Sequence, residues 1–558
     1  MAVPSLDSSS MAIASGVAGI TSWVVLNRKP IPGDYALLLY FACVLALYSY
    51  LYVSHPPEAF YLTSRLTTLY FTSLASTTLI YRVSPFHPLA AYPGPLLWRL
   101  SSLVLVVVSY HGHRHLILDD LHKKYGPFVR IGPNALSVNS PSASNVIYGA
   151  AHHMVKSDSY RFPDRIPGAA LFFKHSREDH AKRKQIWTQG FTGAAVENFF
   201  PPLEKRTWEL THCIERRTDA AGLVNLVECI CHWSYDFMGE MVFGGANNLE
   251  LMRDGDPRGL VQGGKQATAV LDSFGQAPWL FDLIQHIPSQ SMQRLRKIAA
   301  EMMRTRYHAD MKDVKIRDLS SYLIEGDQRT GEQIPLADLE VDAIVAIQGG
   351  SDNTGTTMAL AVFFMLSYPP TYQKLQAILD VAFPDPTAPL DKQTLASIPL
   401  LDAVLTEALR LGSPFFLPRI VPPGHAVIDG KLIPEGTTVA LAAYSQQVSE
   451  DNFFPEPLLD QKVIPSGEVR VSKPISAEHS MFIRYMLGPY VCVAKSFAMQ
   501  EMRLCLSRLI LTFDMSLPPG FNSAAFYKGL RNMRTTMLDL PLFVKAVRRK
   551  GKDTPIFT

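Results

Sequence analysis

The sequence predicts a mainly α-helical domain with small β-sheets, preceded by an N-terminal transmembrane helical region. Three observations indicate this fold class. Three uncharged apolar runs open the chain, long segments with apolar residues at helical spacing follow, and only short β-branched segments lie between them. The 558 residues, 47% of them hydrophobic, suffice for a large core plus membrane segments, and the formal net charge of +3 argues against a nucleic-acid partner.

The apolar runs predict a membrane anchor over residues 1–92, in contact with membrane lipid. The runs cover residues 11–26, 35–53 and 66–81. Only the second reaches the roughly 17–25 residues that a spanning helix usually needs. If all three cross, the cytosolic ends are those after the first run, with Arg28 and Lys29, and after the third run, with Arg82. Basic residues that flank a membrane span are usually cytosolic, so this topology is favoured. If only the second crosses, the others are buried or interfacial helices, so one to three transmembrane helices are expected.

A Pro-Gly-Pro turn at residues 93–95 connects the anchor to a soluble domain expected over residues 93–558. Glycine and proline bracket an apolar, β-branched segment at residues 124–138, which predicts a β-hairpin. Apolar periodicity predicts the clearest helices at residues 225–243, 339–367 and 394–411. Shorter strand-like segments follow at residues 426–433 and 437–443.

Cys492 lies in a glycine-containing stretch just ahead of a helical pattern at residues 495–513. Gly488, four residues earlier, allows the backbone to turn tightly beside a flat ligand. Amide dipoles at the start of a helix favour a thiolate, and a thiolate in this setting suits an axial ligand of haem iron. The alternative is that Cys492 is a small buried apolar residue.

A strongly apolar helical segment is interrupted by Gly349 and Gly350, followed by Asp352, Asn353 and Thr354. Glycine inside a helix costs about 0.5–1 kcal/mol relative to alanine, so close approach of a ligand is one reason for it. The three polar side chains would then lie beside that ligand and pass protons through water. The alternative is a helix break at a loop.

Glu407 and Arg410 are three residues apart, which places both charges on one face of a helix. Their neighbours are nearly all apolar, so we expect a buried ion pair, because buried charges are tolerated only when paired and hydrogen-bonded. A solvated surface pair is the alternative.

In order and spacing, these motifs resemble the cytochrome P450 family of haem-thiolate monooxygenases, in particular fungal membrane-bound members of secondary metabolism. The resemblance covers nearly everything from Pro93 onward. It is carried by Glu407-x-x-Arg410, the Gly349-Gly350-Ser-Asp352 helix, Gly488-x-x-x-Cys492, His180-Ala-Lys-Arg-Lys184, Pro418-Arg419 and Phe454-Pro-Glu-Pro457.

The resemblance implies a haem b cofactor (iron protoporphyrin IX) with the Cys492 thiolate as its axial ligand. It further implies that His180, Lys184 and Arg419 lie near the haem propionates. Tyr490 occupies a position where the family usually has a basic residue, and its hydroxyl could replace that residue only in part. The residue that completes the Glu407–Arg410 network is unassigned, with Lys462 and Arg470 as candidates.

By the same resemblance, Asp352 relays protons toward the haem. Asn353 stands where a threonine is usual and Thr354 follows it, so either one is a candidate for holding water there. The segments expected to line the substrate pocket are residues 160–173, 346–354, 415–417 and 526–537.

The implied activity is oxidation of a lipophilic small molecule, a terpenoid or another secondary metabolite, with O2. No nucleotide or flavin motif occurs in the chain, so electrons would come from an NADPH-cytochrome P450 reductase. The expected location is the endoplasmic reticulum membrane, with the catalytic domain on the cytosolic side. The alternatives are a multi-step oxidase, a desaturase or a rearrangement catalyst of the same family, or a non-catalytic haem-binding membrane protein.

Overall fold

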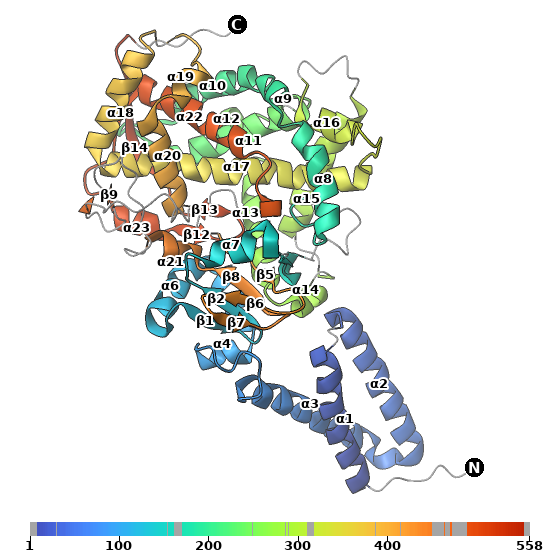
Figure 1. Cartoon of the computed structure of the whole chain (residues 1–558). Helices are drawn as coiled ribbons and strands as arrows, with labels where there is room; N and C mark the ends of the chain where they lie inside the picture. The colour runs from blue at the N-terminus through green and yellow to red at the C-terminus, as the bar shows by residue number, and fades with distance from the viewer. Residues whose placement is uncertain are drawn as a thin grey trace.

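The computed structural model is mostly helical with small sheets, which confirms the predicted fold class (Figure 1). It describes residues 8–28, 31–152, 154–160, 170–247, 249–284, 286–287, 290–309, 317–385, 387–412, 415–448, 462–463, 469–470 and 488–551. The turn predicted at residues 454–457 lies outside these ranges, as does the part of the predicted pocket at residues 161–169.

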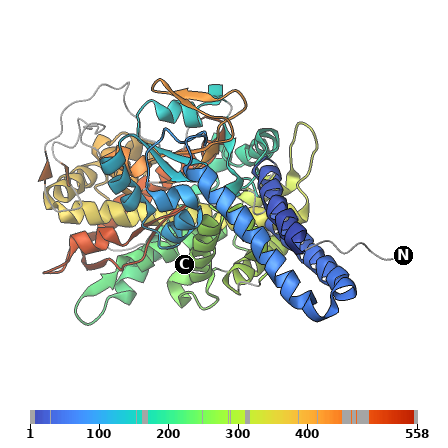
Figure 2. The ribbon, with the colours of Figure 1, turned by 90° about the horizontal axis from the view of Figure 1, so that it is seen from below.

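The N-terminal region forms three long helices that project from one end of the molecule (Figure 1, Figure 2). They are α1 (Ser8–Arg28), α2 (Gly33–Ser54) and α3 (Ala59–Val83), with a 3₁₀ turn at Pro56–Glu58 before α3. Each contains one predicted apolar run. Within the described residues, α1 and α2 are long and apolar enough to cross a membrane.

A five-stranded sheet in the order β1-β2-β8-β5-β3 lies at the end of the body nearest these helices (Figure 1). Its strands are β1 (Phe128–Gly132), β2 (Ala135–Val138), β3 (Val155–Lys156), β5 (Arg419–Ile420) and β8 (Thr438–Leu441). Antiparallel pairing of β1 with β2 confirms the predicted hairpin. The segment predicted at residues 426–433 is also a hairpin, because Asp429 and Gly430 adopt positive φ and turn the chain between β6 (Ala426–Ile428) and β7 (Lys431–Ile433).

Short helices surround this sheet: α4 (Leu96–Leu100), α5 (Leu103–Tyr110), α6 (Arg114–Tyr125), α7 (Ala143–Tyr148) and α21 (Ala443–Val448). The first half of the helical body contains α8 (Arg177–Gln189), α9 (Gly193–Glu197), α10 (Phe200–Arg217), α11 (Leu226–Phe243), α12 (Leu251–Asp254), α13 (Leu260–Phe274), α14 (Pro278–Ile284), α15 (Gln290–His308) and α16 (Leu319–Glu325). The second half contains α17 (Leu336–Ser367), α18 (Pro369–Ala382), α19 (Lys392–Ala396), α20 (Pro399–Gly412), α22 (Lys495–Thr512) and α23 (Ser523–Lys528).

Helix α17, with 32 residues, runs through the centre of the body, and α11 packs along it (Figure 1). It continues through Gly349 and Gly350, so the predicted helix is confirmed and the alternative of a helix break does not occur. The helix predicted over residues 394–411 is instead divided into α19 and α20, because Pro399 cannot continue the hydrogen-bond ladder of α19.

The remaining strands form small sheets at the edges. The order β11-β14-β4 joins β11 (Phe513–Ser516), β14 (Phe543–Arg548) and β4 (Leu223–Asn225). Two-stranded pairs are β12 (Leu530–Asn532) with β13 (Thr536–Leu538) and β9 (Lys462–Val463) with β10 (Val469–Arg470). The turn between β12 and β13 reaches the cavity beside α17.

Candidate functional site

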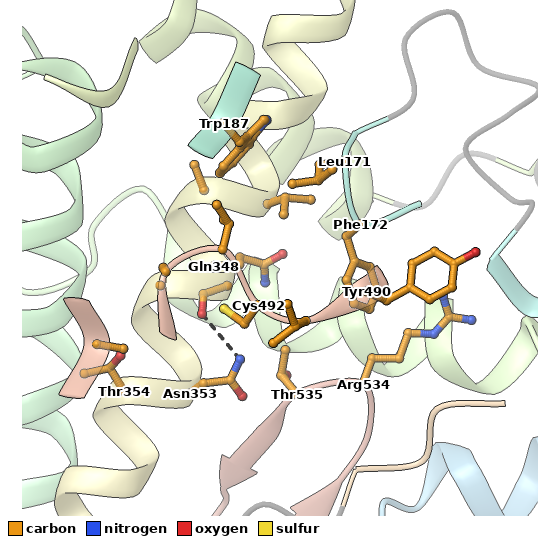
Figure 3. Close-up of a pocket in the computed structure, with 18 of the residues that line it drawn as sticks. Leu171, Phe172, Trp187, Gln348, Asn353, Thr354, Tyr490, Cys492, Arg534 and Thr535 are labelled. Carbon is orange, nitrogen blue, oxygen red and sulfur yellow. Dashed lines mark hydrogen bonds between the residues drawn. The ribbon is translucent and has the colours of Figure 1, made fainter. Parts of the chain in front are cut away.

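Cys492 lies on the loop between a 3₁₀ turn at Gly488–Tyr490 and the start of α22. Gly488 has a φ of +65°, and a Cβ there would lie 2.3 Å from the carbonyl oxygen of Tyr148. A larger residue would push the loop away from α7, so glycine is required for this packing. The loop brings Cys492 to the wall of a cavity of about 320 Å³ (Figure 3).

The Cys492 side chain has accessible surface, but it lies deep in the protein, because its open side faces the cavity. Burial raises the pKa of this thiol, while the N–H of Ala494, the Lys184 ammonium and the N–H of Lys495 act to lower it. Lys184 is held in place by donating to the carbonyl oxygen of Pro489 at 3.0 Å. Positive charge and amide dipoles therefore converge on the sulfur, as a thiolate requires.

The Tyr490 ring forms one end of the cavity, and cationic side chains surround it. The Lys156 Nζ and the Arg419 Cζ each lie 4.9 Å from its centroid. His180 meets the same ring edge-on with 4.7 Å between centroids. Burial and the neighbouring cations lower the pKa of His180 to about 3, so this imidazole is neutral at pH 7.

Arg419 and Lys156 are register partners on the antiparallel strands β5 and β3. Both side chains are buried, and like charges opposite one another on a sheet repel. The Arg419 Nε and Nη2 and the Tyr490 hydroxyl have no hydrogen-bond partner within the described residues. The Lys156 Nζ donates to the carbonyl oxygen of Phe172 at 2.6 Å, whereas Arg419 is a buried cation with unused donors. A buried cation of this kind, beside a second positive charge, fits an anionic cofactor at this end of the cavity.

Helix α17 forms the opposite wall. A Cβ on Gly349 would meet no described atom within 4 Å, whereas one on Gly350 would lie 2.4 Å from the Met238 Cε. Gly349 therefore leaves open space on the cavity side, and Gly350 allows α11 to pack closely.

Asp352 points toward α11 and is absent from the described residues that line the cavity. Its Oδ1 accepts a 2.9 Å hydrogen bond from the Tyr235 hydroxyl, and its Oδ2 has no described partner. Burial raises the pKa of Asp352 to about 6, while the Tyr235 hydrogen bond and the Lys265 charge lower it. A carboxyl that titrates near neutrality can exchange protons under working conditions.

Asn353 and Thr354 both line the cavity. The Asn353 amide donates to the carbonyl oxygen of Gly349 at 3.3 Å and accepts from the Thr536 N–H at 3.4 Å. It therefore ties α17 to β13 at the edge of the cavity.

The remaining lining is mainly apolar and aromatic (Figure 3). The described parts of all four segments predicted to form the pocket contribute to it, by Tyr160 and Leu171–Phe173, by α17, by Phe415 and Leu417, and by Arg534 and Thr535. Gln348 is a polar exception on α17, with its Nε2 3.5 Å from the Thr268 Oγ1.

The predicted Glu407–Arg410 ion pair is formed and largely buried. The Arg410 Nη1 also donates to the carbonyl oxygen of Gln447, which joins α20 to the end of α21. Neither residue is among the described cavity-lining residues. The pair therefore stabilises the packing of α20 against α21 and does not contact the cavity. The side chains of Lys462 and Arg470, the candidates for the third member, lie outside the described part of the structure.

Sequence reasoning missed Lys156, Tyr235 and Glu501 as site residues, and it included Arg534 only within the predicted segment 526–537. Lys156 is recognised as a site residue only from its pairing with Arg419 across the strands. Tyr235 is recognised only from the packing of α11 on α17, which brings it to Asp352. Arg534 lines the cavity with its guanidinium 4.5 Å from the Tyr160 ring. Glu501, on α22, had one available signal, a carboxylate in an apolar helical pattern nine residues after Cys492.

Comparison with known proteins gives a consistent result. A family model described as Cytochrome P450 matches residues 92–533. A "Cytochrome P450 monooxygenase orf5" of Eupenicillium brefeldianum is 28% identical over 492 residues, 87% of this chain and 96% of the relative. "Cytochrome P450 67" of Uromyces fabae is 29% identical, covering 83% of this chain and 87% of the relative. A "Tryprostatin B 6-hydroxylase" of Neosartorya fischeri is 28% identical, with 82% of each chain covered.

Proposed function

The chain belongs to the cytochrome P450 family, and from that premise we propose that this monooxygenase oxidises a lipophilic secondary metabolite, such as a terpenoid, with O2 and electrons from an NADPH-cytochrome P450 reductase. One observation carries the proposal. Cys492 faces a mainly apolar cavity whose opposite wall, α17, is opened by Gly349. A thiolate ligand on one side and space on the other suit a flat cofactor that carries a metal.

The family implies a haem with a cysteine thiolate ligand, and we propose haem b. The Cys492 thiolate would bind the iron, while Lys156 and Arg419 would bind the two propionates. The unused Arg419 donors and the facing like charges support this assignment, because two carboxylates would relieve both. When bound, the haem supplies the activation of dioxygen and the oxidising chemistry.

Other predicted residues take supporting roles in this proposal. His180, as a neutral imidazole, and the Tyr490 hydroxyl would hydrogen-bond to the propionates in place of a further cation. Lys184 would instead favour the thiolate, since its ammonium is bonded to the Cys492 loop. Gly488 sets the path of that loop, and the Glu407–Arg410 pair holds α20 against α21.

Proton delivery is assigned to the α17 wall. Asp352 would supply protons, and its pKa of about 6 supports that role. Asn353 would orient water through its amide, and Thr354 offers a hydroxyl at the same wall. An amide cannot itself pass on a proton in the way that a hydroxyl does, so Asn353 also favours a second candidate within the family, a multi-step oxidase, desaturase or rearrangement catalyst.

The lining supports a lipophilic substrate. Aromatic and aliphatic side chains dominate it, including Phe173, Trp187, Leu319 and Phe415, and their burial against a substrate would drive binding. Gln348 would orient the substrate through one hydrogen bond. The name of the relative that hydroxylates tryprostatin B supports a secondary metabolite as the substrate class.

We further propose that residues 1–92 anchor the protein in the endoplasmic reticulum membrane and that residues 93–558 form the cytosolic catalytic domain. The apolar helices α1 and α2 support membrane attachment. Arg28 and Arg82 lie at the helix ends nearest the catalytic domain, and basic residues favour the cytosolic side.

The test is turnover of a panel of lipophilic metabolites by microsomes that contain the protein and an NADPH-cytochrome P450 reductase, under ¹⁸O2. Incorporation of one labelled oxygen per product supports hydroxylation. An oxidised product without label would overturn hydroxylation and favour the desaturase or rearrangement candidate. NADPH consumption that no substrate increases would instead indicate a haem protein without monooxygenase activity.

A further inference from the structure

We infer that α3 crosses the bilayer together with α1 and α2, and that the N-terminal end of α2 is clamped to α14 at the cytosolic surface. The anchor is then a three-helix membrane domain with the lipid bilayer as its partner. The inference depends on the geometry of the anchor and not on the chemistry at Cys492.

Helix α2 has the length and the exposed apolar surface of a membrane-spanning helix. Its 22 residues correspond to about 33 Å at about 1.5 Å per residue, and a hydrocarbon core is about 30 Å thick. Leu51 is its only buried residue in the described structure. Leu38, Phe41 and Leu45 are each about 60% or more exposed, which is costly in water and favourable in lipid.

The N-terminal end of α2 is fixed to the catalytic domain. The Gly33 N–H donates to the Asp282 Oδ2 at 2.8 Å, and the Asp34 Oδ2 lies 3.2 Å from the His286 Nε2. A Cβ on Gly33 would lie 2.0 Å from the carbonyl oxygen of Trp279, so the start of α2 packs directly on α14. From this contact α2 runs away from the catalytic domain (Figure 1).

The direction of the chain then determines the path of α3. If α2 starts on the cytosolic side and crosses, its C-terminal end is on the other side, and α3 must return for the chain to reach α4. Helix α3 has 25 residues, about 38 Å, which is enough for this return. Its last turn lies beside α4, where the Arg82 Nη1 donates to the carbonyl oxygen of Leu100.

The polar residues of α3 explain why composition alone does not identify it as a span. The Ser73 Oγ donates to the carbonyl oxygen of Gly16 at 2.8 Å, and the Tyr70 hydroxyl donates to the Ser22 Oγ at 2.9 Å. A Cβ on Gly19 would lie 2.6 Å from the Tyr70 carbonyl oxygen, so the two backbones are close. Small residues and interhelical hydrogen bonds of this kind hold helices together within membranes.

The outer face of α3 is apolar, with Phe60, Phe71 and Ile80 each more than 40% exposed. Exposed apolar residues also lie on the catalytic domain at the ends of α1 and α3: Trp279 and Ile287 near the start of α2, and Leu97 on α4. Aromatic and aliphatic side chains in this arrangement favour the membrane interface.

Topology is tested with Asn-Ser-Thr acceptors in flexible Gly/Ser spacers, which report exposure to the lumen by N-glycosylation in microsomes. The native sequence has no Asn-x-Ser/Thr acceptor, so the background is zero. We expect glycosylation of a spacer inserted after His55, but not of spacers inserted before Gly33 or after Ser84. Any other pattern overturns the inference, and equal modification after His55 and Ser84 would show that α3 does not cross.

The clamp is tested separately by cross-linking Asp34→Cys with His286→Cys through a short bismaleimide. After cleavage of the intervening chain, the two fragments should remain joined. The control pair, Glu58→Cys with His286→Cys, should not join, because Glu58 lies at the far end of the anchor. Equal joining of both pairs, or none for Asp34, overturns the clamp. The carbon monoxide difference spectrum of the same microsomes reports the haem–thiolate site independently, so failure of one proposal is distinguishable from failure of the other.

Discussion

The two walls of the cavity differ in how their polar groups are satisfied. On the α17 wall, Asp352 is hydrogen-bonded to Tyr235, and the Asn353 amide is bonded at both its donor and acceptor atoms. At the Tyr490 end, Arg419 faces another cation and retains two unused donors within the described structure. Within the described residues, folding satisfies these polar groups of the first wall except the Asp352 Oδ2, whereas the second leaves two donors of a buried cation for an anion. The difference separates residues that tune chemistry from residues that hold a cofactor.

The largest expected effect comes from substitution of Cys492, the proposed iron ligand. Cys492→Ser should abolish the strongly red-shifted absorption of the ferrous carbon monoxide complex and all measurable turnover, because a hydroxyl is a poor replacement for a thiolate ligand. Cys505→Ser is the matched control, since Cys505 is a buried cysteine of α22 outside the described cavity lining. Persistence of the band in Cys492→Ser would disprove the ligand assignment.

Substitution at the Tyr490 end should weaken cofactor binding. For Arg419→Gln we expect haem to transfer to apomyoglobin about 10- to 100-fold more readily, the equivalent of about 1.4–3 kcal/mol for a charge-assisted hydrogen bond. Asp352→Asn, on the other wall, should leave haem transfer unchanged while lowering product formation. Equal haem loss in both variants would remove the distinction between the walls.

Substitution on the α17 wall should change proton delivery and leave the haem in place. Tyr235→Phe removes a hydrogen bond that lowers the pKa of Asp352, so that pKa should rise above about 6. The inflection in the pH profile of coupled turnover should therefore move to higher pH by up to about one unit, the worth of one hydrogen bond. Tyr372→Phe, which removes a buried hydroxyl bonded to the Phe513 carbonyl, should leave the profile unchanged. An unmoved inflection in Tyr235→Phe would exclude Asp352 from the relay.

A smaller effect is expected at Asn353. Asn353→Thr loses the amide that bonds to Gly349 and Thr536, and it introduces a hydroxyl at the cavity wall. The ratio of product to NADPH consumed should change by about two- to tenfold, the worth of one neutral hydrogen bond. Thr356→Val is the control, because the Thr356 hydroxyl also joins α17 to Thr536. The same change in both variants would attribute the effect to the tether rather than to the amide.

The smallest effect concerns pH and stability on the Cys492 side. Burial raises the pKa of Glu501 to about 8, so the folded protein holds a proton that the unfolded chain releases above its ordinary pKa of 4.5. Stability therefore falls as pH rises from 4.5 to 8. Glu501→Gln should raise Tm relative to the parent by an amount that grows across that range, as measured by thermal denaturation. A constant difference in Tm would mean that Glu501 does not titrate there.

The sequence predicted what local pattern determines. Helices α11, α17 and α22 lie within a few residues of their predicted ranges, because apolar periodicity continues along each of them. The division between α19 and α20 was predictable only if Pro399 had been treated as a helix breaker. The pairing of Lys156 with Arg419 depends on register between strands far apart in sequence, and Asp352 turns to Tyr235 because of helix packing. Neither contact has a local signal.

The contact of Gly33 with α14, and of Asp34 with His286 just after it, has a consequence for motion. A body tethered to a membrane at one point can swivel about it, whereas a body held at two points can mainly rock. The junction of α3 with α4 is one point and the α14 contact is the other. The catalytic domain would therefore present a fixed tilt to any protein diffusing in the same membrane, and their encounter would become a search in two dimensions.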